Sequence, residues 1–225
     1  MADGSQQAPK RSKLEYKDTF TVLVGPEKES FVLHASIATT HSKFFQAACR
    51  GKFKEAKEKV VRLLEVSEET FRAYVQWMYS GTVVVMDKQE HEADADCCVH
   101  EVNLVKLYIL ADTLAALPLR NKTIDEYVVF SRSPSSGTVS LCIKLAYKHT
   151  PVGSRLRELF VDENVYWSAY WTKWLKRQLH HLPVEFISDL AIGMAERGWV
   201  RPTDPCMREK CAYHEHDEEF PACSD

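Results

Sequence analysis

The alternation of apolar and polar positions predicts a β-hairpin near the start of the chain. Positions 19–24 place Phe, Val and Val on one face and Thr, Thr and Leu on the other, which is typical of a strand. Gly25 and the proline after it end this strand, and a second strand follows at 31–34. The apolar run 60–64 predicts a third strand, so this part of the chain is expected to form a small sheet.

Apolar residues at helical spacing follow the second and the third of the expected strands. Short helices are predicted over 35–40 and 42–49, with Ser42 able to cap the second through its hydroxyl. A longer helix is predicted after Ser67, with two glutamates in its first turn and Gly81 just past its end. Its apolar face should carry Phe71, Val75 and Met78, with Tyr74 beside them and Trp77 on the flank. A short strand is expected at 82–86.

Residues 87–131 are expected to form an acidic loop followed by two helices. Residues 87–101 hold six carboxylates against one lysine, which predicts a mobile acidic loop. An amphipathic helix is expected from Leu104 to Leu114, and Pro118 fits the first turn of another that runs to Ser131.

The C-terminal half is predicted to be helical. Three pieces are expected at 138–149, 153–180 and 183–197, with a break near 162–164 in the middle piece. The middle piece carries Trp167, Trp171 and Trp174 at a spacing that places all three on one face. Burial in a core is the favoured interpretation, because so aromatic a face is not expected to stay exposed; docking of a partner is the alternative.

These patterns divide the chain into five parts. Residues 1–16 are polar and predicted to be disordered, and 17–131 form the first folded unit. The run 132–137, rich in Ser with one Pro and one Gly, is a predicted linker. Residues 138–200 form the helical region, and 201–225 form a tail without periodicity.

Several residues of the first unit carry a resemblance to a known family. A strand ends at His34, Ser42-x-Phe-Phe45 opens the second short helix, and the longer helix closes on Tyr79-Ser-Gly81. Together these closely resemble a BTB/POZ domain, in particular those of fungal BTB proteins. The resemblance implies an α+β fold, with a small mixed sheet capped by a cluster of helices. A smaller all-α region and a Cys/His tail would follow it.

The resemblance also implies a function. BTB domains are protein–protein interaction modules, and many recruit a cullin scaffold for ubiquitination or associate with a second copy of themselves. The partner contacts implied by the family lie on the 67–80 helix and the loop after it, at Tyr74, Trp77, Met78, Tyr79 and Met86. Many BTB domains place a Lys or Arg directly after the histidine, facing the strand aspartate in a charged pocket. Ala35 stands there, which argues against a corepressor-binding transcription factor.

Composition narrows the function classes. Hydrophobic residues make up 45% of the 225 residues, and the net charge is −3 with a pI near 6.3, so no basic face for nucleic acid is expected. No apolar stretch approaches a membrane span, and the expected location is cytoplasmic or nuclear with reduced cysteines. No nucleophile elbow, phosphate loop, dinucleotide fingerprint or His-Glu-x-x-His motif is present, so the chain is predicted not to be an enzyme.

One cluster has the chemistry of a metal site. The tail reads Cys206-x4-Cys211-x2-His214-x-His216-x6-Cys223, and thiolates with neutral imidazoles are the ligands that zinc prefers. The wide first cysteine pair and the close histidines match no familiar zinc finger, so a flexible tail with incidental cysteines is the alternative. The Cys-x-Tyr-His-x-His within it is similar to the tail of some fungal BTB proteins. A second function is therefore a zinc-binding regulatory protein in which the tail acts and the first unit only oligomerises it.

Overall fold

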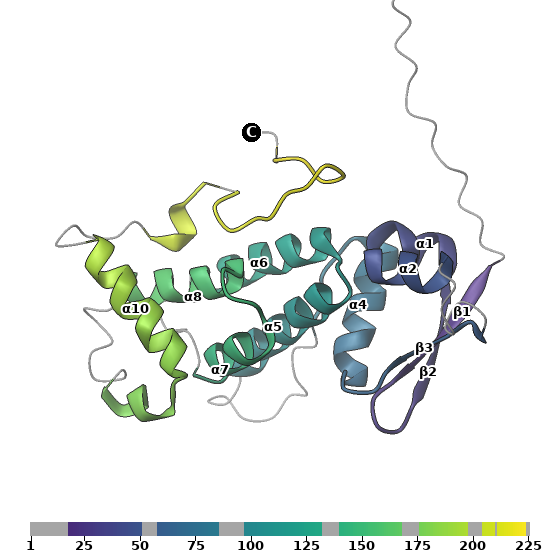
Figure 1. Ribbon diagram of the computed structural model, residues 1–225, viewed down its shortest axis with the longest axis horizontal. Helices are drawn as coiled ribbons and strands as arrows, with labels where there is room; N and C mark the ends of the chain where they lie inside the picture. Colours follow the sequence, from purple (N-terminus) through teal and green to yellow (C-terminus); the bar gives the residue numbers. More distant parts are fainter. Residues whose placement is uncertain are drawn as a thin grey trace, which may run out of the picture.

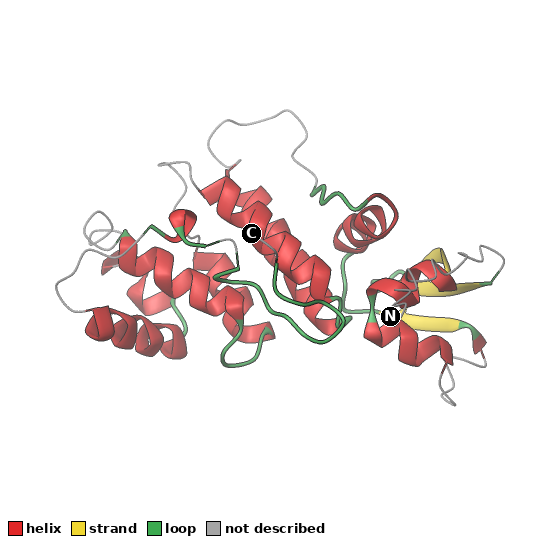
Figure 2. Cartoon of the chain, turned by 90° about the horizontal axis from the view of Figure 1, so that it is seen from above, coloured by secondary structure: helices red, strands yellow, loops and turns green. Residues whose placement is uncertain are grey.

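The computed structural model describes residues 18–50, 58–85, 97–131, 140–167, 176–197, 204–209 and 211–223. Its strands lie at one end of the molecule, and helices fill the remainder, as Figure 1 and the view from above in Figure 2 show. The mixed α+β class predicted from the sequence is confirmed. The expected disordered segment, most of the acidic segment and the expected linker lie outside the described residues.

The sheet has three strands in the order β2-β1-β3. β1 (Thr19–Val24) and β2 (Glu29–His34) pair antiparallel, which confirms the predicted hairpin, while β3 (Val60–Leu63) pairs with β1 in parallel. The turn between β1 and β2 uses Gly25 at a φ of 72°, a left-handed conformation that a residue without a Cβ adopts at little cost. Alternate positions of β1 are buried, as the sequence pattern predicts.

Two short helices follow β2 and are joined at a single residue. α1 (Ala35–His41) and α2 (Lys43–Arg50) meet at Ser42, whose Oγ accepts a hydrogen bond from the Phe45 amide at 3.1 Å. The predicted cap is therefore confirmed. The same hydroxyl donates to the Leu114 carbonyl at 2.6 Å, so the cap also ties these helices to the helical part of the molecule.

α4 (Glu68–Ser80) has both of its predicted ends. The Ser67 side chain accepts a hydrogen bond from the Thr70 amide, and Gly81 closes the helix at a φ of 74°. α4 contacts α1 on one side and α5 on another, so more than one of its faces is covered. Its buried side chains are Phe71, Ala73, Tyr74, Trp77 and Met78.

The structure corrects two expectations about the segment after α4. Residues 82–85 carry no strand, and Met86 lies outside the described residues. The acidic loop was expected to run to residue 101, but α5 (Cys97–Thr113) begins before that point and buries Glu101 to 1% exposure. Helix formation wins there because the next turns of α5 carry apolar side chains that the core accommodates.

α5 is the central helix rather than an amphipathic one at the surface. It contacts α4, α6 and α7, so its apolar side chains are covered on nearly every side. α6 (Leu117–Ser131) follows, with Pro118 in its first turn as predicted. The buried apolar residues of α5 are Val102, Leu104, Val105, Leu107, Tyr108, Leu110 and Ala111.

The described part of the C-terminal half includes α7 (Ser140–His149), α8 (Arg155–Tyr166) and α10 (Val184–Arg197), with short 3-10 turns η1 (Leu179–His181) and η2 (Pro205–Met207). η2 begins the described part of the tail. Figure 1 shows this tail, in yellow, running back along α8 and α6 toward α2.

The break predicted at 162–164 is wrong. α8 continues through these positions, and their side chains are buried. The polar groups find partners without interrupting the helix: Asn164 donates to the Phe160 carbonyl at 2.8 Å, and Asp162 accepts from Tyr213 at 2.8 Å. Trp167 caps the C-terminal end of α8, while Trp171 and Trp174 lie outside the described residues.

Both halves of the chain share one hydrophobic core. A single cluster of buried side chains extends from Phe20 in β1 to Tyr213 in the tail. Tyr127 of α6 packs on Phe160 of α8, with ring centroids 5.3 Å apart. The helical region therefore completes the core of the first unit instead of standing apart from it. No helix in the described part of the chain is both long and apolar enough to cross a membrane.

Candidate interaction face and metal-ligand cluster

The structure buries most of the residues expected to contact a partner. Tyr74, Trp77 and Met78 are at most 6% exposed, because α4 lies between α1 and α5. They belong to the core of this structure, and their side chains are not presented at its surface. Tyr79 is 45% exposed, and Met86 lies outside the described residues.

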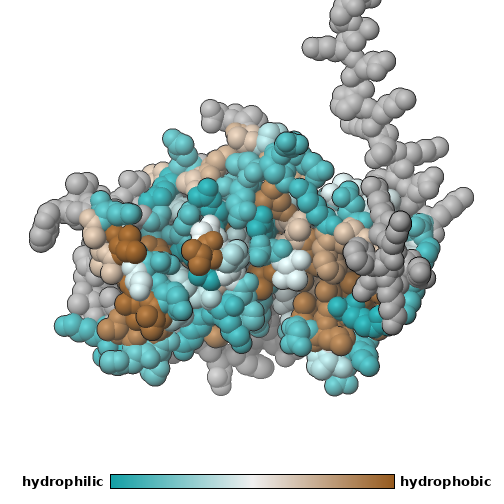
Figure 3. Space-filling model, in the orientation of Figure 1, coloured by the Kyte–Doolittle hydropathy of each residue, from teal (hydrophilic) through white to brown (hydrophobic). Residues whose placement is uncertain are grey.

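Tyr79 is held in place although it is exposed. Its hydroxyl lies 2.8 Å from Nδ1 of His34 and accepts a hydrogen bond from the His34 amide at 3.3 Å. The two rings meet edge to face at 5.9 Å. Val84, also exposed, follows Gly81 beyond the end of the same helix. The C-terminal end of α4 thus carries a fixed aromatic ring, and an exposed apolar side chain follows five residues later in the chain. Figure 3 shows apolar surface, in brown, in the part of the molecule where Figure 1 places α4 and the sheet.

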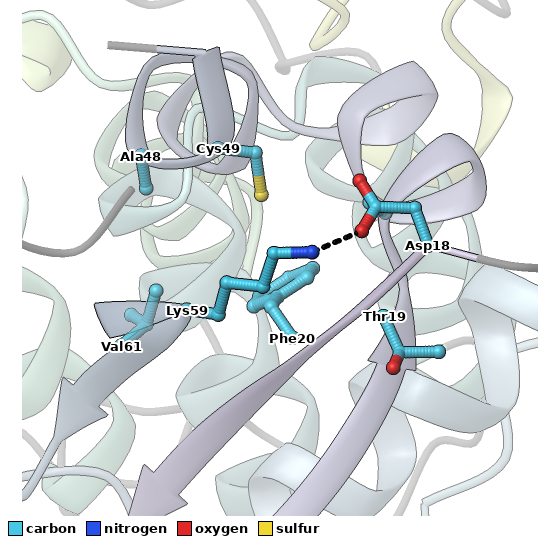
Figure 4. A pocket seen from close by; sticks show the side chains of 8 residues that line it. Asp18, Thr19, Phe20, Ala48, Cys49, Lys59 and Val61 are labelled. Atoms are coloured by element: carbon cyan, nitrogen blue, oxygen red, sulfur yellow. Dashed lines mark hydrogen bonds and ion pairs between the residues drawn. The ribbon is translucent and has the colours of Figure 1, made fainter. Parts of the chain in front are cut away.

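A small pocket lies where β1, β3 and α2 meet. Figure 4 shows two of its lining side chains, Asp18 and Lys59, the residue before β3, meeting at an Nζ–Oδ1 distance of 2.5 Å. Ala35 contributes no charge to this pocket, so its positive group comes from another part of the chain. Both charged side chains are about three-fifths exposed, and such a surface pair contributes at most about 1 kcal/mol.

The tail folds so that four of the five predicted metal ligands converge. Ligand atoms of Cys211, His214, His216 and Cys223 all lie within 4.8 Å of one another. The side chain of Cys206 lies outside the described residues. The sequence predicted the residue types, and the structure brings four of them to one point.

Asp125 of α6 stands behind this cluster. Its Oδ1 lies 2.8 Å from Nε2 of His214, while Nδ1 of the same ring lies 3.3 Å from Sγ of Cys223. His214 is buried at 5% exposure. With the Nε2 proton donated to Asp125, the Nδ1 lone pair faces the thiol.

The remaining tail contacts hold this segment against α6, α2 and α8. Glu215 pairs with Arg120 at 2.7 Å, and its backbone forms two hydrogen bonds with the Asn121 side chain, at 2.8 and 3.0 Å. Lys43 of α2 pairs with Asp217 at 2.7 Å. The hydroxyl of Tyr213 bonds to Asp162 of α8, so the tail bridges helices of both halves.

Comparison with protein families identifies the first unit. A family model described as BTB/POZ domain matches residues 11–122, about half of the chain. This chain carries a BTB/POZ domain. The match covers the sheet, α4, α5 and the start of α6, and it confirms the family suggested by the sequence motifs.

The names of the similar curated proteins pair a BTB domain with Kelch repeats. The chain is 32% identical over 71 residues to "Kelch repeat and BTB domain-containing protein 4" of Homo sapiens and of Pongo abelii, and 36% identical over 62 residues to that of Mus musculus. The human alignment covers 32% of this chain and 13% of that protein. The chain thus matches about one eighth of the length of these relatives.

Sequence reasoning missed two residues of these sites. Asp125 lies 89 positions from His214, and Lys59 lies 41 positions from Asp18. No local spacing links either pair, because each depends on how distant elements pack. Only the parallel pairing of β3 with β1, and the return of the tail to α6, bring them together.

Proposed function

We propose that this protein is an adaptor whose BTB domain recruits a protein partner, and that a cullin-type ubiquitin-ligase scaffold is such a partner. The BTB domain is a protein–protein interaction module, which supports the first part. The second part rests on the resemblance to BTB domains that bind cullins. Self-association with a second copy is the alternative within the same class.

The observation that carries the proposal is the exposed end of α4. Tyr79 is exposed but fixed by His34, so docking on its ring costs little additional side-chain entropy. Aromatic residues of this kind are enriched among those that dominate interface energies. Val84, five residues further along the chain and beyond Gly81, is a second exposed apolar side chain.

Replacing Val84 with aspartate is expected to weaken binding of the intact chain to a cullin N-terminal domain at least about tenfold, because a charge would be desolvated at the contact. Isothermal titration calorimetry measures this directly. Val129→Asp is the matched control, since Val129 is also an exposed valine, at 60% against 44% for Val84, but lies on α6. No association of the wild type at roughly tens of micromolar would remove the ligase proposal. Equal weakening by both substitutions would contradict the assignment of the α4 end.

A further inference from the structure

The second site of the molecule is the convergence of thiols and imidazoles in the tail, and it lies outside the interaction face. Zinc bound by two thiolates and two imidazoles has bonds of about 2.3 and 2.0–2.1 Å, which places neighbouring ligand atoms roughly 3.3–3.8 Å apart. The four atoms here lie within 4.8 Å of one another. A small contraction of the cluster would therefore close a tetrahedral shell.

The backbone is already turned to present these ligands. The His214 amide donates to the Cys211 carbonyl at 3.1 Å, so the Cys-x2-His segment forms a tight turn with both side chains on the same side. A second turn returns Cys223 to the cluster. There the Asp217 carboxylate accepts from the amides of Glu219 and Phe220, at 2.9 and 3.0 Å.

Asp125 provides an independent indication of a metal. Histidines that bind a metal almost always donate their other ring N–H to a carboxylate, a backbone carbonyl or water, which fixes the ring and its tautomer. His214 has this arrangement: Nε2 faces Asp125, and Nδ1 faces Cys223 within the cluster. Because the carboxylate comes from α6, the orientation of His214 is set by an element outside the tail.

We propose that Cys211, His214, His216 and Cys223 bind one structural zinc ion that cross-links the tail into a clamp, held on α6 through the hydrogen bond from His214 to Asp125. Four protein ligands leave no open coordination position, so the site is structural rather than catalytic. The tail between 211 and 223 has no helix or strand, and a bound metal cross-links its two turns directly. The clamp also fixes Glu215 and Tyr213, which contact α6 and α8 respectively.

The test uses the intact chain, purified with reductant. Its zinc content is measured by inductively coupled plasma mass spectrometry, and its zinc affinity by competition with a chelator. We expect one zinc per chain in the wild type and in Cys49→Ser, a half-buried thiol outside the cluster that serves as control. Cys211→Ser is expected to lose the zinc. His216→Gln is a second ligand variant that is expected to lower the zinc affinity. His216 is exposed, so its replacement does not disturb the core.

Asp125 gives a finer test. Asp125→Asn is expected to keep one zinc but to weaken its affinity about 10–100-fold, whereas Glu126→Gln, the next residue on α6, is expected to leave it unchanged. Absence of zinc from the wild type after zinc is added would overturn the proposal. So would wild-type affinity in both Cys211→Ser and His216→Gln, or a Cys211–Cys223 disulfide in protein kept under reductant.

Discussion

Replacing Phe160 with alanine is expected to lower the free energy of unfolding by about 3–5 kcal/mol, a large share of the stability of a typical domain. Phe160 is fully buried in α8, and its ring packs on Tyr127 of α6. Truncation would remove the transfer free energy of the ring and leave a cavity at the junction of the two halves. The BTB domain is therefore expected to lose stability together with the C-terminal helices.

Denaturant-dependent hydrogen exchange measures this for each element separately. Peptides from α4 and from α10 are expected to lose protection in one cooperative transition, shifted to lower denaturant in Phe160→Ala. Val152→Ala serves as control, because Val152 is 92% exposed and its truncation should change stability by less than about 0.5 kcal/mol. Two separate transitions, with α4 unaffected by the substitution, would show that the halves fold independently.

The stability of the chain is expected to fall as the pH rises from about 5 to about 8, and Glu101 is the cause. Burial, and after it the charge of the nearby Glu163, raise the pKa of its carboxyl to about 8. Its Oε1 has no hydrogen-bond partner among the described residues. The folded state therefore binds this proton more tightly than the unfolded chain, whose carboxyl titrates near 4.5.

The stabilisation that Glu101 contributes is complete below its unfolded pKa. It is lost as the pH rises toward and through its folded pKa. Between pH 5 and pH 8, the wild type is expected to lose on the order of 3 kcal/mol more stability than Glu101→Gln, which keeps a neutral side chain throughout. Urea denaturation across this range measures the difference. Glu65→Gln, an exposed carboxyl, should follow the wild type. Parallel pH profiles for wild type and Glu101→Gln would contradict the assignment.

The elements that sequence patterns predicted well are those that are determined locally. The hairpin follows from alternation ended by Gly25, and α4 follows from the Ser67 cap and the left-handed Gly81. Each signal lies within a few residues of the structure it specifies. The family could be recognised because its motif residues, such as Ser42 and Gly81, lie at the ends of these locally determined elements.

What the sequence did not predict depends on packing between distant segments. α5 was expected to be amphipathic, but the C-terminal helices cover its other side. Tyr74 and Trp77 were expected at a contact surface, but both faces of α4 that carry them are enclosed. Asp162 was expected near a break, but Tyr213 satisfies its carboxylate from the tail. Periodicity shows that a face is apolar and does not show how many neighbours will cover the helix.

In the tail, the sequence predicted the candidate ligands but not how they are brought together. The five candidate ligands could be read from residue type alone, and four of them converge. Their order in the chain gave no familiar motif, because the Asp217 turn, and not regular spacing, brings Cys223 back to the others. The carboxylate of Asp125 completes the arrangement from α6, where no tail motif could indicate it.

The most direct test of the clamped tail is the zinc K-edge X-ray absorption spectrum of the intact, reduced chain. The proposed site predicts a first shell of two sulfur atoms at about 2.3 Å and two nitrogen atoms at about 2.0–2.1 Å, with one zinc per chain. A shell of oxygen and nitrogen alone, or no bound zinc, would contradict it.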